Sequence, residues 1–181
     1  MGDDQELVTA RLCLRRPSPA DIDAIYRIHH DPRACEHNPA DLLDTRADAE
    51  DLYHRWDLHW QRHGFGYWVV YPLDASDPRN SLGFCGVKLM RLADREVLNL
   101  LYRLDPDAWG NGVATEAATA VIDWAAAHQP DHPHIARVRP ANIGSARVAA
   151  RAGLHRAEHL DTDGEDGLDL IYANNWAEPC A

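Results

Sequence analysis

The fold is decided by the stretch Leu104-Asp105-Pro106-Asp107-Ala108-Trp109-Gly110-Asn111-Gly112-Val113-Ala114-Thr115-Glu116-Ala117. Residues 97–104 at its start are almost continuously apolar, which predicts a central strand covered on both faces. From Val113 onward, apolar residues recur at helical spacing. A strand that passes through two glycines into a helix leaves backbone N–H groups unpaired at the helix start. Such groups bind anions and suit a pyrophosphate.

Two known kinds of phosphate loop do not fit this stretch. A P-loop needs a lysine and a hydroxyl residue after its last glycine, whereas Val113 and Ala114 follow Gly112. A dinucleotide-binding fingerprint needs a third glycine where Thr115 stands, and the chain lacks repeated βαβ units. Taken alone, two glycines before a helix are equally typical of a plain tight turn.

The chain upstream of this stretch predicts strands and helices in alternating groups. Ser18 and Pro19 are typical of a helix start, Thr45 is a typical helix cap, and Gly64 a typical helix end. The predicted elements are strands over residues 9–15, 65–71 and 82–92, helices over residues 19–31 and 45–64, and a polar loop over residues 33–44.

The chain downstream completes a mixed sheet. The predicted elements are a strand over residues 134–139, a helix over residues 142–153, and strands over residues 155–161 and 168–173 around a turn at 162–167. The order is then β-α-α-β-β-β-α-β-α-β-β, which indicates a mixed α/β (α+β) sheet and neither a doubly wound sheet nor a barrel. No repeat or linker divides the chain, so we expect one domain over residues 1–181.

Composition excludes several classes of function. The net charge is −11, from 29 acidic and 18 basic residues, so we expect no nucleic-acid partner and favour a cationic one. No apolar run is long enough for a membrane span, and the polar start Met1–Glu6 does not resemble a signal peptide. The four cysteines form no CxxC pair, and His59 and His63 lack a third ligand, so we expect no metal and a cytoplasmic protein.

The opening stretch closely resembles the acetyl-CoA loop of GNAT acetyltransferases, most of all the RimJ/RimL-like branch with its Trp-Gly-x-Gly-x-Ala-Thr-Glu-Ala string. The segments 138–147 and 152–154 resemble that branch's Asn-x-x-Ser helix and its closing Gly-hydrophobic pair, and residues 9–15 resemble its first strand. The resemblance spans roughly residues 7–176. It implies a GNAT fold, with a mixed, mostly antiparallel central sheet that is splayed at its middle strands and flanked by helices.

The resemblance also implies acetyl-CoA as cosubstrate and assigns residues to it. Trp109 stands at the family's Gln/Arg position, and Asn142 is expected beside the cofactor. Backbone amides of Gly110, Asn111, Gly112, Val113, Ala114 and Thr115 are expected around the pyrophosphate. The backbone of Tyr102, Arg103 and Leu104 is expected to pair with the pantetheine as an added strand.

The catalytic residues depart from the family's pattern. Many relatives have a tyrosine that acts as general acid at the position where Ala149 stands here. RimL-like relatives use the serine at the Ser145 position instead. Ser145 is therefore the candidate hydrogen-bond donor to the thiolate, and we expect it beside the cofactor thiol. A serine in a first helical turn equally often bonds its own backbone. A glutamate base is expected at Asn99, or in another branch at Arg137, and neither is a carboxylate.

Two sources of a base therefore stay open, and so does the function. Asn99 is the candidate for holding a relay water, and Glu36 and His37 are candidate substrate residues if their loop covers the acceptor. We expect an N-acetyltransferase that moves acetyl to a primary amine by direct attack in a ternary complex. A protein N-terminal α-amine predicts an open groove, and a small-molecule amine predicts a closed acidic pocket. A catalytically silent acyl-CoA-binding sensor is the alternative, and a homodimer is compatible with the sequence.

Overall fold

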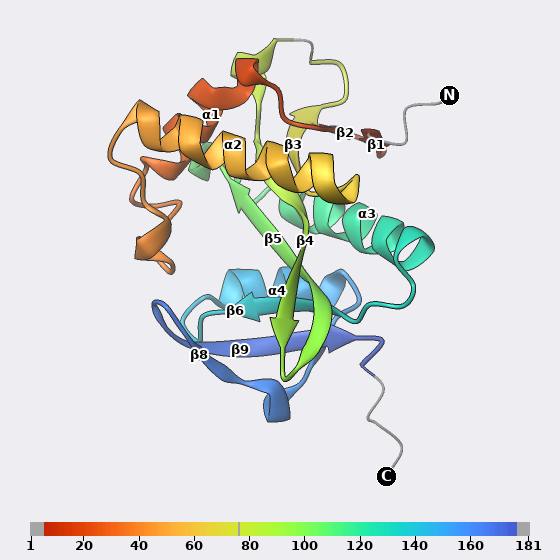
Figure 1. The fold of residues 1–181 in the computed structure, drawn as a ribbon. Helices are drawn as coiled ribbons and strands as arrows, with labels where there is room; N and C mark the ends of the chain where they lie inside the picture. Colours follow the sequence, from red (N-terminus) through yellow and green to blue (C-terminus); the bar gives the residue numbers. More distant parts are fainter. Residues whose placement is uncertain (1–5, 76, 177–181) are drawn as a thin grey trace.

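The computed structural model describes residues 6–75 and 77–176, and it contains a nine-stranded sheet in the order β1-β2-β3-β4-β5-β6-β9-β7, with β8 paired to β9 (Figure 1). Residues 1–5 and Cys180 lie outside the described residues, so the predictions made from the polar N-terminus and from that cysteine are not described by the structure. The strands are β1 (Glu6–Val8), β2 (Leu12–Arg15), β3 (Tyr67–Pro72), β4 (Gly83–Leu92), β5 (Arg95–Leu104), β6 (His134–Val138), β7 (His155–Arg156), β8 (Thr162–Gly164) and β9 (Gly167–Asn174). All neighbouring strands of the described residues pair antiparallel except β5 and β6, which confirms the predicted mixed, mostly antiparallel sheet.

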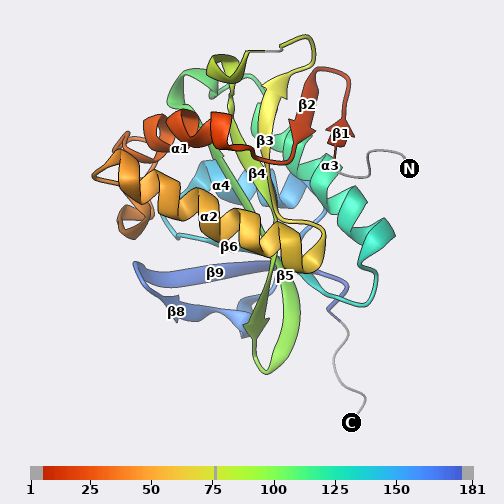
Figure 2. The ribbon, with the colours of Figure 1, turned by 45° about the horizontal axis from the view of Figure 1, so that its top comes forward.

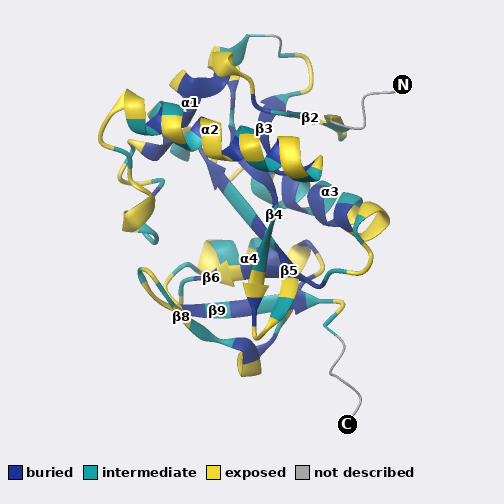
Figure 3. Ribbon diagram, in the orientation of Figure 1, coloured by how far each residue is buried: buried dark blue, intermediate teal, exposed yellow. Residues whose placement is uncertain are grey.

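Four helices cover the two faces of the sheet (Figure 2). They are α1 (Ile22–His29), α2 (Arg46–His63), α3 (Val113–His128) and α4 (Ile143–Arg151). Helix α1 and the first part of α2 bury Ile25 and Trp56 against Phe84 of the sheet, while α3 and α4 bury Val121 and Ala149 against the other face. Figure 3 shows that the most buried strands lie between these layers. Within residues 6–75 and 77–176, no helix combines the length and apolar character that a membrane span requires.

Local chemistry sets the ends of α2 where the sequence predicts them. The Thr45 side chain accepts from the backbone N–H of Asp48, and the Asp48 carboxylate accepts from the N–H of Thr45 at 2.8 Å, which forms a capping box. Gly64 ends the helix at φ 77°, in the left-handed region that costs glycine little. Both ends depend on residues adjacent in sequence, and this is why they are predictable.

Two predicted strands are wrong in part. Of residues 9–15 only Leu12–Arg15 is strand, because residues 9–11 form the turn of a hairpin between β1 and β2, in which the Thr9 backbone N–H donates to Leu12 O at 2.9 Å. Residues 155–161 give a strand of only two residues, followed by a 3₁₀ turn at Glu158–Leu160. The Glu116 side chain, from a distant part of the chain, holds the first turn by accepting from Thr9. At the second turn the Asp161 carboxylate accepts from the backbone N–H of Ile171 at 2.9 Å.

The sheet opens between its two parallel strands. Strands β5 and β6 pair only from Leu98 opposite His134 to Leu100 opposite Ala136. On its other side β5 stays paired with β4 as far as Leu104 opposite Gly83. Residues 101–104 of β5 therefore have a strand partner on one side alone, which confirms the predicted splay at the middle strands.

Candidate functional site

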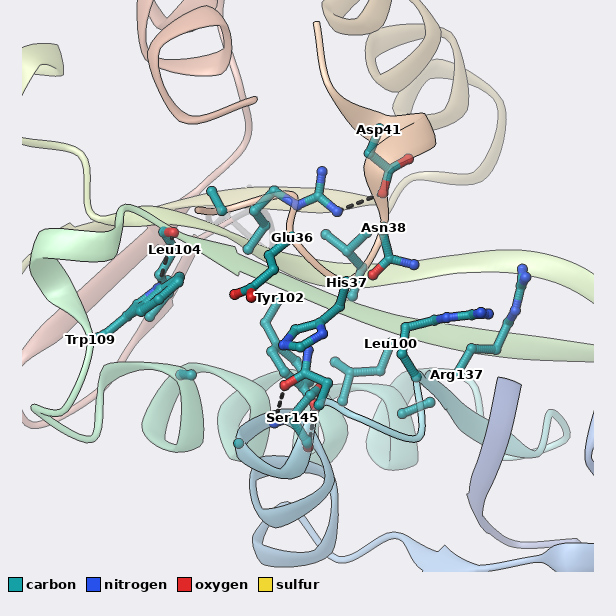
Figure 4. Close-up of a pocket in the computed structure, with 18 of the residues that line it drawn as sticks. Glu36, His37, Asn38, Asp41, Leu100, Tyr102, Leu104, Trp109, Arg137 and Ser145 are labelled. Atoms are coloured by element: carbon teal, nitrogen blue, oxygen red, sulfur yellow. Dashed lines mark hydrogen bonds and ion pairs between the residues drawn. The ribbon is translucent and has the colours of Figure 1, made fainter. Parts of the chain in front are cut away.

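A cavity of about 680 Å³ occupies the opening between β5 and β6, a volume usual for small-molecule sites. Its walls come from the loop between α1 and α2, the ends of β5 and β6, the start of α3 and the first turn of α4. Figure 4 shows Trp109 at one end and Arg137 at the other, with Ser145 between them on the α4 side. The sequence-predicted site residues that line it are Glu36, His37, Asn99, Tyr102, Arg103, Leu104, Trp109, Gly110, Gly112, Val113, Ala114, Thr115, Asn142 and Ser145.

The Trp109 end is an anion site made of backbone. Helix α3 starts at Gly112 with φ 75° and no side-chain cap, so the N–H groups of its first turn have no intrahelical partner. These groups and the helix dipole favour a negatively charged ligand. The Trp109 indole donates to Leu104 O at 3.3 Å, which ties the loop back to the end of β5.

Asn111 is the one predicted site residue that the cavity lining does not include. Its carbonyl accepts from Arg11 Nη1 at 3.0 Å, and its side-chain amide donates to Trp109 O at 3.1 Å. Both contacts shape the loop, so the structure gives Asn111 a role in loop conformation.

Glu116, which helical periodicity places on a solvent-facing stripe, instead fastens α3 to the first hairpin. Its Oε1 accepts from Thr9 Oγ1 at 2.6 Å and from Arg11 N at 3.0 Å, and its Oε2 accepts from Arg11 Nε at 2.7 Å. Burial raises the pKa of Glu116, and the hydrogen bonds from Thr9 and Arg11 outweigh burial, so its pKa is lowered. The carboxylate is therefore ionised, and Arg11 offsets its charge beside the anion site.

The sequence resemblance implies coenzyme A as the ligand of this anion site, and for that ligand replacing Glu116 by Ala should weaken binding about tenfold, about 1.4 kcal/mol. The loss removes the bonds that hold the first turn of α3, and it leaves Arg11 free to move away from the Asn111 carbonyl. Calorimetric titration with coenzyme A measures the change. Asp123→Ala, on an exposed position of the same helix, is the matched control; equal affinities of the two variants would contradict the role of Glu116.

A hydroxyl pair lies in the middle of the cavity. Tyr102 Oη lies 2.7 Å from both the carbonyl oxygen and the Oγ of Ser145. A tyrosine carries one hydroxyl hydrogen, so it satisfies one of these two oxygens at a time. When Tyr102 donates to Ser145 Oγ, the Ser145 hydrogen is free to point elsewhere in the cavity. Burial raises the pKa of Tyr102, which keeps it a neutral donor.

The first turn of α4 holds Ser145 in place. The Asn142 Oδ1 caps the helix by accepting from Ser145 N at 2.9 Å. The Ser145 side chain bonds Tyr102, which lies 43 positions away on β5. Ala149, where relatives carry a tyrosine, is fully buried against the core.

The Arg137 end has polar groups of a different kind. Asn99 Oδ1 is buried and has no hydrogen-bond partner among the described residues. Arg103 is buried, donates to Asp41 Oδ2 at 2.5 Å, and lies 3.3 Å from the Cys35 sulfur, so it ties β5 to the loop above. Figure 4 shows Glu36, His37 and Asn38 descending from that loop toward the strand.

Sequence reasoning missed the group that closes this end. Ala40 N donates to Asp166 Oδ1 at 3.1 Å, so the α1–α2 loop touches the β8–β9 turn. Buried Asp169 accepts from Arg137 Nε at 2.8 Å and pairs with Arg139 at 3.1 Å. These contacts join segments more than 25 positions apart, and no local pattern in the sequence marks them. Within the described residues, no group of three or more His, Cys, Asp or Glu side chains is placed to hold a metal ion.

The splayed sheet, the uncapped start of α3 and the hydroxyl pair between them define an acetyltransferase fold of the GNAT type. The chain belongs to the GNAT acetyltransferase family, since the family model described as "Acetyltransferase (GNAT) domain" matches residues 11–155.

Known relatives agree with this assignment. YkkB, an uncharacterized protein of Bacillus subtilis (strain 168), is 30% identical over 164 residues, which is 88% of this chain and 91% of YkkB. The crystal structure of an acetyltransferase from Agrobacterium tumefaciens str. C58 is similar with a TM-score of 0.78 and 24% identity, over 97% of both chains. RimL, a ribosomal L7/L12 alpha-N-protein acetyltransferase in complex with coenzyme A, is similar with a TM-score of 0.71 and 16% identity, over 92% of this chain and 95% of RimL. The two structures support the fold.

Proposed function

We propose that the protein transfers acetyl from acetyl-CoA to a primary amine, as a member of the RimJ/RimL-like branch. The observation that carries the proposal is that one cavity joins the backbone anion site at Gly112 to the hydroxyl pair of Tyr102 and Ser145. A pyrophosphate suits the first turn of α3, and the unpaired side of residues 101–104 suits the pantetheine amides. The cosubstrate supplies an activated acetyl thioester.

Different residues of the cavity act on the leaving thiolate and on the attacking amine. Tyr102 donates to Ser145 Oγ, and the Ser145 hydrogen then stabilises the leaving thiolate. His37 lines the cavity from the covering loop, and Figure 4 shows its ring directed toward Tyr102 and Ser145. We assign it the proton of the attacking amine, because imidazole is the usual general base.

A small-molecule acceptor agrees best with the closed Arg137 end. The contact between Ala40 and Asp166 bridges the two walls, and a peptide N-terminus would need an open groove at that place. The buried Arg103 fixes the loop that carries His37.

Thiol release from acetyl-CoA, measured against separate panels of small amines and peptides, tests the proposed function. Release with a small-molecule panel and acetylated product by mass spectrometry would support it. Calorimetry with acetyl-CoA runs in parallel. Binding without release in any well would favour the silent acyl-CoA sensor, and no binding would exclude both functions.

Ser145→Ala should lower kcat about 100-fold while the affinity for acetyl-CoA changes less than twofold, since this is the lower end of what a positioned donor contributes. Tyr102→Phe should lower kcat by a smaller factor, because it removes only the bond that orients the Ser145 hydroxyl. Steady-state kinetics and calorimetry measure the two effects. A double variant as impaired as Ser145→Ala alone is expected if both act as one unit; wild-type kcat in Ser145→Ala would make this serine structural.

A further inference from the structure

The floor of the Arg137 end is one row of side chains on the α1–α2 face of the sheet. Tyr67 pairs with Gly86, and Gly86 pairs with Leu101. Arg137 follows Ala136, the last residue of β6 that pairs with β5, and so it faces the opening beside Leu101. Paired residues share a face of a sheet. Asn99 lies on the same face, two positions before Leu101.

Three polar groups of this floor have hydrogen-bonding atoms without a partner among the described residues. Asn99 Oδ1 is a buried acceptor with no partner in the described chain. The Tyr67 hydroxyl makes no hydrogen bond to any described residue, and burial raises its pKa, so it stays a neutral donor. Arg137 uses Nε and Nη2 for Asp169, while Nη1 has no partner within residues 6–75 and 77–176. A ligand that fills this end can accept hydrogen bonds from two donors, the Tyr67 hydroxyl and Arg137 Nη1.

The floor also carries an excess of positive charge. Asp169 is almost fully buried, with 3% of its side chain exposed, and it is shared by two guanidinium groups. Arg139 also donates to the carbonyls of Asp166 and Gly167. Both arginines line the cavity, and the Arg137 side chain is 34% exposed against 11% for Arg139, so Arg137 is the more accessible of the two charges.

The carboxylates of the lining do not offset this excess at the floor. Asp41 is paired with buried Arg103, and Asp166 lies on the β8–β9 turn, where it accepts from Ala40 N and has no ion-pair partner among the described residues. Glu36 and Glu165 lie exposed at the mouth, where solvent screens their charge. A polycation therefore meets a guanidinium at the floor and only solvated carboxylates outside.

We propose that the amine acceptor is a small α-amino acid, whose carboxylate binds Arg137 Nη1 and the Tyr67 hydroxyl while its amine lies beside the Asn99 side chain, which lines the same cavity. This inference rests on the proposed acetyl transfer. Asn99 and Arg137 are diagonal neighbours on adjacent strands, about 7–8 Å apart at their backbones. Their side chains, directed into one opening, leave room for an amine and a carboxylate that share one carbon atom.

The arrangement also serves the chemistry of the amine. A guanidinium near an ammonium group favours loss of its proton, so Arg137 helps to produce the neutral nucleophile. The nitrogen then forms a C–N bond with the acetyl carbon as the C–S bond breaks. The ammonium loses two protons in all; one ends on the thiol and the other passes to solvent. The products are an N-acetyl amino acid and free coenzyme A.

The test compares each common α-amino acid with its own α-amide, and with linear polyamines, in separate thiol-release assays. The amide keeps the side chain and the amine and lacks only the carboxylate. We expect at least one amino acid to have kcat/KM at least tenfold above its amide. Arg137→Met should raise KM for that amino acid at least tenfold and leave KM for the amide unchanged. Arg91→Met, on an exposed arginine outside the cavity lining, is the control and should change neither value.

Calorimetry with acetyl-CoA separates the failure of this proposal from failure of the proposed function. If acetyl-CoA binds and amides or polyamines are acetylated at least as well as amino acids, the carboxylate proposal is overturned and the transferase stands. If acetyl-CoA does not bind, both fall. If acetyl-CoA binds and no amine is acetylated, titration of the coenzyme A complex with N-acetyl amino acids and their amides decides; equal affinities would overturn the proposal.

Discussion

Gly112→Trp is expected to reduce affinity for acetyl-CoA at least 100-fold, about 2.8 kcal/mol, while the protein stays folded. Gly112 holds φ 75° and lines the cavity at the start of α3. A side chain there is strained in this backbone conformation, and it occupies the space through which a pyrophosphate reaches the helix amides.

Gly153→Trp is the matched control for this experiment. Gly153 has φ 90° and no atom within 4 Å of an added Cβ, so the backbone strain is of the same kind. It lies outside the cavity lining. Calorimetry and thermal unfolding should show similar stability for both variants and lost binding only for Gly112→Trp. Equal affinity in the two variants would remove the loop from the binding site.

Gly86→Ala should destabilise the fold by about 3 kcal/mol, at the upper end for overpacking. An added Cβ would lie 2.2 Å from Gly66 O and 2.5 Å from Tyr67 Cα. Both are backbone atoms, so relief requires strands β3 and β4 to separate. For a chain of this size the midpoint of thermal unfolding should fall by about 10 °C.

Gly144→Ala is the control for that measurement, because its added Cβ meets nothing nearer than 3.7 Å. Alanine is also the better helix former, so this variant should be as stable as the wild type or slightly more stable. Denaturant unfolding of both proteins gives the comparison. A free energy of unfolding for Gly86→Ala within about 0.5 kcal/mol of wild type would show that the two strands yield easily.

The sequence predicts best where a feature depends on near neighbours. Thr45 caps α2 through Asp48, three positions on, and Gly64 ends that helix through its own backbone freedom. The Gly110–Gly112 loop is recognisable for the same reason, since its glycines and the helix that follows are consecutive. These features depend on chemistry inside one short window, and that chemistry is visible without tertiary structure.

Prediction failed where distant segments decide the outcome. Glu116 has the spacing of a solvent-facing residue, yet a turn 105 positions away supplies its hydrogen bonds. The same contact holds the turn at residues 9–11, so that the predicted first strand is shortened to Leu12–Arg15. Nothing in the sequence of Leu101–Leu104 indicates that strand β6 stops pairing with β5 there. The splay of the sheet was predictable only from the resemblance to the family. From the sequence, Arg137 is only a position at which one branch of the family has a glutamate. Its ion pair with Asp169 is not predictable, because Asp169 comes from another strand.

The short pairing of β5 with β6 gives the sheet an edge in its interior. An exposed edge normally attracts further polypeptide and promotes aggregation. Here α4 and the α1–α2 loop flank the edge. The fold thereby leaves the backbone N–H and C=O groups of this edge free to bind an extended ligand, while the flanking elements shield the same groups from the strands of other proteins.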